Sequence, residues 1–98
     1  MTAISALVTD LMDRSRISAA LPDATFTLMP DADVVIVDLA RGVEQVASVR
    51  ASHPGARIVA YGPHVDDDSM KAARAAGADV VVPRSRFFRD PAQIVGQG

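Results

Sequence analysis

Four short runs of branched apolar residues constrain the fold of this chain more than any other feature of its sequence. They are ISALV (4–8), DVVIV (33–37), RIVAY (57–61) and DVVV (79–82). Strands buried on both faces of a parallel sheet have such near-continuous apolar runs, whereas strands with one solvated face alternate between apolar and polar residues. The four runs therefore predict a small parallel sheet that is covered by helices on both sides.

The segments between these runs have the apolar spacing of helices, and residues that stop a helix follow each of them. Pro22 follows the first, HPG (53–55) closes the second, and Gly77 ends the third. DDDS (66–69) is typical of a helix start, where carboxylates cap free N–H groups. Alternating strands and helices predict an α/β three-layer sandwich, and the length of the chain predicts a single domain over residues 1–98.

The segment 22–32 does not fit this alternation. TFTLM (25–29) resembles a strand, yet only three residues separate it from the next run, and a parallel crossover needs about a dozen. It is either an extended passage under the sheet or an outer strand that is paired in another way, for example with a second chain. Both leave the edge near strand 4–8 short of cover. Because an uncovered edge invites pairing, we expect a homodimer.

Polar residues stand where the predicted strands end. Thr9 and Asp10 follow the first strand, Asp38 the second, Gly62 the third, and Arg84 comes just after the fourth. Ligands of parallel α/β sheets gather at the carboxyl ends of the strands, so these residues predict one site. Asp38 is then either a reactive carboxylate or a polar residue that marks the end of its strand.

Two stretches resemble the receiver domains of bacterial response regulators. DVVIVDLARG (33–42) is similar to their phosphoacceptor strand, an apolar run closed by Asp-Leu. Residues 57–87 resemble their last strand–helix–strand unit, in which the helix ends in Ala-Gly-Ala before an apolar strand and a basic residue. The resemblance covers residues 3–90. It implies a flavodoxin-like fold with a sheet of four to five parallel strands, an irregular edge at 25–29, and the second helix of the family missing.

The resemblance makes Asp38 the phosphoacceptor-like residue of an incomplete site. Receivers hold Mg²⁺ with two acids after the first strand, where this chain has Thr9 and Asp10, so Asp10 and Asp38 would bind the ion weakly. Gly62 stands where receivers carry a hydroxyl, and Arg84 where they carry lysine. A guanidinium is not equivalent to an ammonium group. We expect Arg84 to pair directly with Asp38 and to lock the site.

The resemblance thus implies a degenerate pseudo-receiver of two-component signalling, which contacts a protein partner such as a kinase or regulator without obligatory phosphorylation or cofactor. An alternative is a receiver in which Asp38 is phosphorylated with Mg²⁺ bound at Asp10 and Asp38. A third is a small-ligand site at the strand ends, although VTDLMDR (8–14) contains no glycine for a phosphate loop. A purely structural Asp38 is also open. The sequence offers no pairing of a nucleophile with a base, so we do not expect an enzyme.

RSRFFRD (84–90) predicts the surface that meets the partner. Arginine and aromatic residues are enriched at interface hot spots, and in receivers the last strand and helices form the usual contact face. We expect Arg86, Phe87, Phe88 and Met70 to line a protein interface. The commoner outcome for two adjacent phenylalanines is that one packs in the core and the other lies on the partner surface.

Composition narrows the class of partner and the compartment. A formal net charge of −2 and four aromatic residues without tryptophan argue against nucleic-acid binding. No apolar run approaches the roughly 20 residues of a membrane span. The absence of cysteine excludes disulfides and thiolate sites and favours a cytoplasmic protein. His64 near 66–69 could suggest a metal site, but adjacent acids on a first helical turn do not converge, so capping is favoured. His53 is expected to interact with the end of the second helix.

Overall fold

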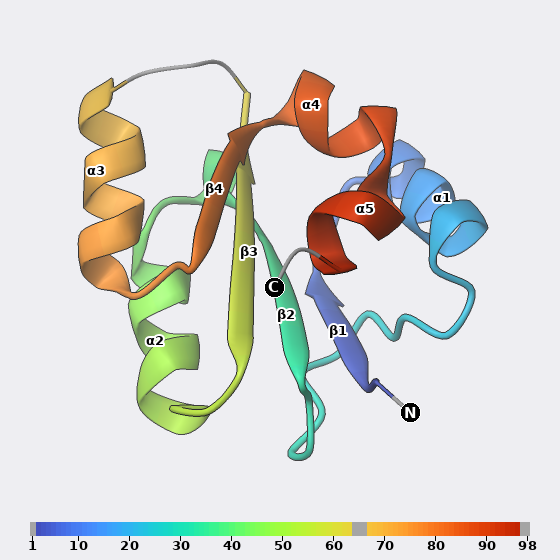
Figure 1. The fold of residues 1–98 in the computed structure, drawn as a ribbon, viewed down its shortest axis with the longest axis horizontal. Helices are drawn as coiled ribbons and strands as arrows, with labels where there is room; N and C mark the ends of the chain where they lie inside the picture. Colours follow the sequence, from blue (N-terminus) through green and yellow to red (C-terminus); the bar gives the residue numbers. More distant parts are fainter. Residues whose placement is uncertain (1, 64–66, 97–98) are drawn as a thin grey trace.

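A parallel four-stranded sheet lies at the centre of the molecule (Figure 1). The computed structural model describes residues 2–63 and 67–96. The strands stand side by side in chain order, and each lies within one residue of its predicted bounds: β1 (Ile4–Leu7), β2 (Val34–Asp38), β3 (Arg57–Gly62) and β4 (Val80–Pro83). All three pairings are parallel, as expected from the apolar runs.

Helices cover both faces of this sheet, which confirms the three-layer α/β architecture. In Figure 1, α2 and α3 lie on one side of the sheet, and α1 and α5 lie on the other. Among the described residues, no helix has both the length and the apolar character to cross a membrane. The helices are α1 (Leu11–Ala20), the 3-10 helix η1 (Leu39–Arg41), α2 (Glu44–Ser52), α3 (Asp67–Ala76), α4 (Arg84–Arg89) and α5 (Pro91–Gly96).

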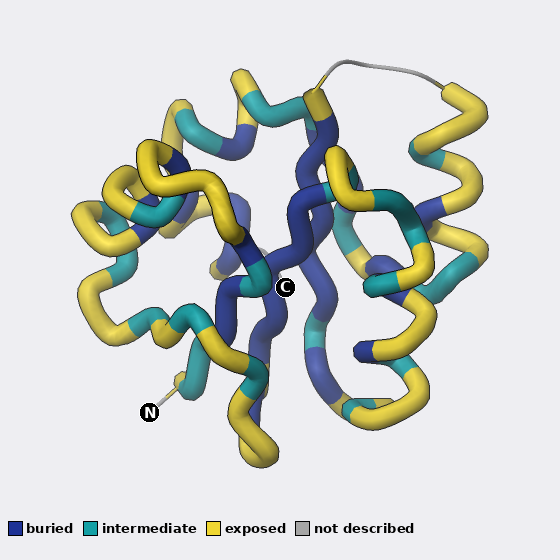
Figure 2. Tube along the Cα trace, turned by 180° about the vertical axis from the view of Figure 1, so that it is seen from behind, coloured by how far each residue is buried: buried dark blue, intermediate teal, exposed yellow. Residues whose placement is uncertain are grey.

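Each face of the sheet has its own apolar core, because successive side chains of a strand point to opposite faces. Val34 and Ile36 of β2 pack with α1, α4 and α5, whereas Val35 and Val37 pack with α2 and α3. Figure 2 shows the strands buried along most of their length and the outer surfaces of the helices exposed. Burying one such branched side chain contributes roughly 1.5–3 kcal/mol, so the doubly covered strands supply much of the driving force for folding.

The segment 22–32 forms an irregular outer edge beside β1. Thr25 pairs with Ser5 in a single parallel bridge, and its N–H donates to the carbonyl of Ile4 at 3.0 Å. Further along, the N–H of Met29 donates to Oγ of the buried Ser5 at 3.0 Å. Residues 21–33, all of them described, contain no helix, as expected. The chain itself therefore occupies part of the edge whose exposure motivated the homodimer prediction.

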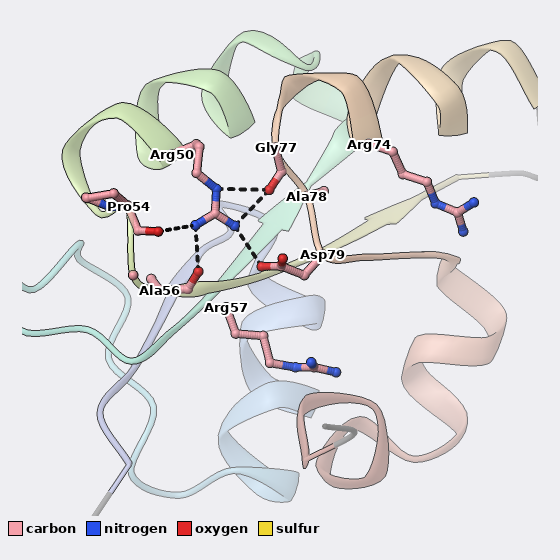
Figure 3. A pocket seen from close by; sticks show the side chains of 9 residues that line it. Arg50, Pro54, Ala56, Arg57, Arg74, Gly77, Ala78 and Asp79 are labelled. Carbon is pink, nitrogen blue, oxygen red and sulfur yellow. Dashed lines mark hydrogen bonds and ion pairs between the residues drawn. The ribbon is translucent and has the colours of Figure 1, made fainter.

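One arginine connects the segments that lead into β3 and β4, at the edge of the sheet where these two strands begin (Figure 3). The guanidinium of Arg50, on α2, donates to the carbonyls of Gly77 at 2.8 and 3.1 Å, of Pro54 at 3.0 Å and of Ala56 at 2.8 Å. It also pairs with the carboxylate of Asp79 at 2.7 Å. We call these five residues the Arg50 cluster. It joins the end of α2 to the start of β3, and the end of α3 to the start of β4.

Candidate functional site

The polar residues singled out at the strand ends lie at one edge of the sheet. Because all four strands are parallel, their carboxyl ends share that edge, and Asp38 and Gly62 are the last residues of β2 and β3. Thr9 and Asp10 lie between β1 and α1, and Arg84 is the first residue of α4, directly after β4. The order of the strands thus gathers these residues as the sequence predicted.

Asp38 is nearly buried, with 8 % of its surface exposed. Its Oδ1 accepts a hydrogen bond from the N–H of Ala40 at 2.9 Å and so caps η1. Burial is the main cause that raises the pKa of Tyr61, and the hydrogen bond to Asp13 is the main cause that raises the pKa of Arg84; the charge of Asp38 adds to both shifts. Asp38 is therefore part of the electrostatic environment of this edge, and it also closes its own strand.

Asp10 and Thr9 both make local hydrogen bonds. Asp10 is the N-cap of α1, and its Oδ1 accepts from the N–H of Asp13 at 2.9 Å. Thr9 accepts at Oγ1 from the guanidinium of Arg41 at 3.0 Å. Within the described residues, no three His, Asp or Glu side chains are grouped as ligands of a metal ion would be. The oxygens expected to bind Mg²⁺ are thus partly engaged by the chain itself.

Arg84 forms its ion pair with Asp13, and the expected pairing with Asp38 was wrong. Its two Nη atoms meet the two carboxylate oxygens of Asp13 at 2.6 and 2.9 Å, a bidentate arrangement. The Tyr61 hydroxyl donates to the same carboxylate at 3.0 Å. Asp13 is 1 % exposed, so its carboxylate exchanges water for these three donors.

The protonation of this group follows from its contacts. The hydrogen bond from Arg84 is the main cause that lowers the pKa of Asp13, and the bond from Tyr61 adds to it, while burial opposes both. The same bond to Asp13 raises the pKa of Arg84. Burial raises the pKa of Tyr61, and the charges of Asp38 and Asp13 raise it further. At neutral pH the pair is ionised and the tyrosine is a neutral donor.

Aromatic rings lie against Arg84, the cation of the ion pair. Tyr61 stacks on Phe87 with ring centroids 4.8 Å apart, and Phe88 meets both rings edge-on at 5.2 and 4.9 Å. The guanidinium of Arg84 lies 5.1 Å from the centre of the Phe88 ring, and that of Arg16 lies 5.7 Å from it. These separations are typical of favourable aromatic and cation–π contacts. We call Asp13, Tyr61, Arg84, Phe87 and Phe88 the Asp13 network.

The predicted contact surface does not form one patch. Phe87 is fully buried, at 0 % exposure, which removes it from any surface, whereas Phe88 is half-buried and Arg86 is exposed. Met70 packs against the core formed with α2 and α3, on the other face of the sheet from Phe88. Of the four residues, only Arg86 and Phe88 are thus left together on α4, in agreement with the expectation that one phenylalanine packs inside.

Asp13 is the residue of this site that was not predicted from the sequence. It stands four positions before Ile17, which is also buried, so both lie on the inner face of α1. An acid on the apolar face of a predicted helix was the available indication. His53 stands at the C-cap of α2, the helix end where it was expected, and its ring contacts the carbonyl of Met29 at 2.9 Å and the Ser52 hydroxyl at 2.7 Å.

Two further features concern the remaining alternatives. A groove of about 210 Å³ opens beside the carboxyl edge, and Leu39, Gly62, Met70 and Val82 are among the residues that line it. This groove is the space available to a small ligand at the strand ends. His64 and Asp66, which the capping and metal interpretations involve, lie outside the described residues.

Comparisons with known proteins show which solved structures have a similar architecture. No protein-family model and no curated protein matches the sequence. A response regulator from Thermotoga maritima is similar in structure, with a TM-score of 0.75 at 14 % identity over 99 % of this chain and 100 % of that one. A response regulator from Burkholderia pseudomallei, solved with a phosphorylated aspartic acid, calcium and citrate, has a TM-score of 0.81 at 12 % identity over 99 % of this chain and 68 % of that one. The receiver domain of a DNA-binding response regulator from Colwellia psychrerythraea has a TM-score of 0.66 at 18 % identity, over 99 % of this chain and 100 % of that one. The four parallel strands in chain order, the helices on both faces and these matches over almost the whole chain together show that this protein has the fold of a response-regulator receiver domain.

Proposed function

We propose that this chain is a receiver-type signalling module that acts by protein–protein contact and does not require phosphorylation of Asp38. The observation that carries the proposal is the bidentate pair between Arg84 and Asp13. In a receiver, the basic residue after the last strand would meet a phosphoryl group on the acid at Asp38. Here a buried carboxylate already holds that cation, so the contact that phosphorylation would create has an internal substitute.

Other residues at this edge support the same conclusion. Gly62 offers no hydroxyl to a phosphoryl group on Asp38. Receivers hold a metal ion with two acids after the first strand, and of the two residues at those positions here, Thr9 and Asp10, only Asp10 is an acid. Phosphoryl transfer to a carboxylate requires charge neutralisation, and Mg²⁺ prefers several well-placed oxygen ligands. With Asp10 capping α1, a phosphoryl group at Asp38 would have weak support.

The partner we propose is another protein, which contacts α4 through Arg86 and Phe88. Arg86 is exposed and the Phe88 ring is half-buried beneath two guanidinium groups, so an arginine–aromatic surface lies next to the Asp13 network. Such residues are frequent among interface hot spots. A homodimer is a second form of this contact, and light scattering of the purified protein across concentrations would detect it.

A second candidate function is phosphoacceptance by Asp38. Asp38 stands at the carboxyl end of β2 and keeps 8 % of its surface exposed, and both facts favour this function. The related fold from Burkholderia pseudomallei was solved with a phosphorylated aspartic acid. In that case Mg²⁺ would bind at Asp10 and Asp38.

One experiment separates the two functions. The protein is incubated with Mg²⁺ and acetyl phosphate, and in parallel with beryllium fluoride, and its intact mass and melting temperature are measured. An unchanged mass and an unchanged melting temperature are expected at saturating donor. An adduct that Asp38→Asn abolishes and Asp31→Asn leaves intact would contradict the proposal and establish the phosphoacceptor.

The contact surface has a separate test. Proteins captured by the tagged chain are compared with those captured by an Arg86→Ala/Phe88→Ala double variant and by a Lys71→Ala control on α3. We expect a specific partner to be lost with the double variant alone. Equal capture by all three forms would exclude α4 as the contact surface.

A further inference from the structure

The groove at the carboxyl edge of the sheet is bounded by four parts of the chain. Its described lining comes from Leu39 and Ala40 of η1, from the end of β3 with Pro63, from Met70 in the first turns of α3, and from the end of β4. In Figure 1, α3 starts at this same edge, beside β4. Ligands of parallel α/β sheets bind at the carboxyl ends of the strands, so the groove lies where a ligand is expected.

The groove offers apolar contacts and no charge. Leucine, methionine, valine, alanine and proline make up most of its described lining, and none of the described lining residues is charged. Pro63 and Pro83 both line it without a backbone N–H, so neither can donate to an anion. Two acids, Asp67 and Asp68, precede the lining residues of α3. These features disfavour a phosphate or carboxylate ligand.

Water is poorly accommodated in such a space. The groove has a volume of about 210 Å³, which is room for several water molecules at roughly 30 Å³ each. A well-held water molecule needs about two to four polar partners, and apolar side chains supply none. Because weakly held water is displaced with a gain in affinity, an apolar ligand is favoured here.

The volume of the groove also limits the size of its ligand. Sites for drug-sized molecules span roughly 300–1,000 Å³, and this groove is smaller. An apolar cavity of about 150 Å³ is large enough to bind benzene. The groove therefore fits one ring with a short substituent.

The geometry points to a binding site for one small, neutral molecule with a single apolar ring, held between η1 and α3 at the carboxyl edge. The ring would be buried against Leu39, Met70 and Val82. The ligand would contact η1, the segment that Asp38 caps. The described residues that line the groove include none of α4 or of the Asp13 network, so binding does not depend on the function proposed above.

The test is a titration of the ¹⁵N-labelled protein with benzyl alcohol, and in matched series with benzoate and benzylamine, which join the same ring to a negative and a positive charge. We expect saturable shifts with benzyl alcohol at the amides of residues 39–40, 62, 69–71 and 81–82. Its affinity should exceed that of either charged probe at least about tenfold, because an apolar groove does not compensate a charge.

Three outcomes of this titration would overturn the proposal. The absence of saturation with benzyl alcohol would exclude the site. Equal or tighter binding of benzoate would indicate an anion site, and equal or tighter binding of benzylamine would indicate attraction to the acids of α3. Either of these two results refutes a neutral ligand.

Matched variants locate the site. Ala40→Phe places a ring in the groove and should weaken the binding of benzyl alcohol at least about tenfold, since the ring takes up the space of the ligand. Ala47→Phe, at an exposed position of α2 outside the groove, should leave the affinity unchanged. Met70→Gln keeps the length of the side chain but makes one wall polar, so it should also weaken binding. Circular dichroism checks that each variant folds. Undiminished binding by Ala40→Phe, or equal weakening by Ala47→Phe, would refute this location.

Discussion

Asp13 holds a negative charge where almost no water reaches it. A buried carboxylate is costly unless charged and polar groups compensate it, and removing one partner of such a pair is costlier still. Arg84 and Tyr61 together supply three hydrogen bonds to its two oxygens. The side chain of Arg84 remains 38 % exposed, which moderates the strength of the pair relative to one that is fully enclosed.

Replacing Asp13 by asparagine should therefore destabilise the protein. The substitution keeps the shape and an acceptor for Tyr61 but removes the charge that Arg84 meets. We expect a loss of about 1.5–3 kcal/mol in the free energy of unfolding, as for hydrogen bonds to charged groups. Urea denaturation measures it, with the surface substitution Asp31→Asn as control. A change of similar size in both variants would exclude a special role for the Asp13 network.

The same pair predicts how stability depends on pH. Because the pKa of Asp13 in the folded protein lies below its ordinary value of 3.8, its contribution is fully present above the unfolded pKa and is lost as the pH falls through the folded one. The difference in unfolding free energy between the unsubstituted protein and Asp13→Asn should be constant from pH 7 down to about pH 5 and should shrink below about pH 4. Denaturation curves at stepped pH values test this, and a difference that grows on acidification would contradict it.

The sequence located the residues of the carboxyl edge but not their pairing. Asp10, Asp38 and Arg84 could be placed together because the apolar runs predict parallel strands, whose ends share an edge. Asp13 could not be found in that way, since it belongs to a helix and reaches the edge only through the packing of α1 on the sheet. The acid with which an arginine pairs depends on side-chain distances, and strand order does not determine these.

At the scale of elements, glycine sets the end of α3. Gly77 has φ of +122°, a backbone conformation that side chains rarely adopt, and a Cβ there would lie 2.8 Å from Cγ of Arg50. The Arg50 cluster can therefore close only because this position carries no side chain.

Gly77→Ala should accordingly destabilise the fold by roughly 1–3 kcal/mol, the cost of holding a strained backbone conformation. Gly55→Ala is the matched control, because a Cβ at Gly55 meets nothing within 4 Å. Thermal melting of the two variants side by side is the measurement. A larger loss at Gly55 than at Gly77 would show that the Arg50 cluster does not depend on the glycine.

Other elements were predictable to different degrees. The strands were found to within one residue because each is an unbroken apolar run, and residues 25–29 were recognised as irregular because the connection to β2 is too short. Helix α4 was missed, since a short helix that buries Phe87 as its only fully enclosed side chain has no apolar period to read. Because α4 begins directly after β4, Phe87, which was predicted to line the partner surface, lies in the core.

At the scale of the whole molecule, the two cores share one sheet and should unfold together. Tyr61 is the only tyrosine and the chain has no tryptophan, so ultraviolet fluorescence reports the core on the side of α1, whereas circular dichroism reports all helices. For a domain of this size we expect the two probes to give coincident urea transitions. Transitions that separate would mean that the layers of α2 and α3 unfold independently.

The Arg50 cluster also limits how the length of this chain can vary. One guanidinium spans the connections α2–β3 and α3–β4, so an inserted residue in either would pull a carbonyl or Asp79 out of its reach. The α1–β2 connection is held instead by separate contacts, among them the Thr25 bridge, the contacts of Met29 and the packing of Leu21, Ala24 and Phe26 on the core, so an extra residue between two of them displaces fewer contacts at once. Length variants among natural or engineered relatives should therefore accumulate between α1 and β2, and a peptide tag or a new loop grafted there has the best prospect of leaving the rest of the molecule intact.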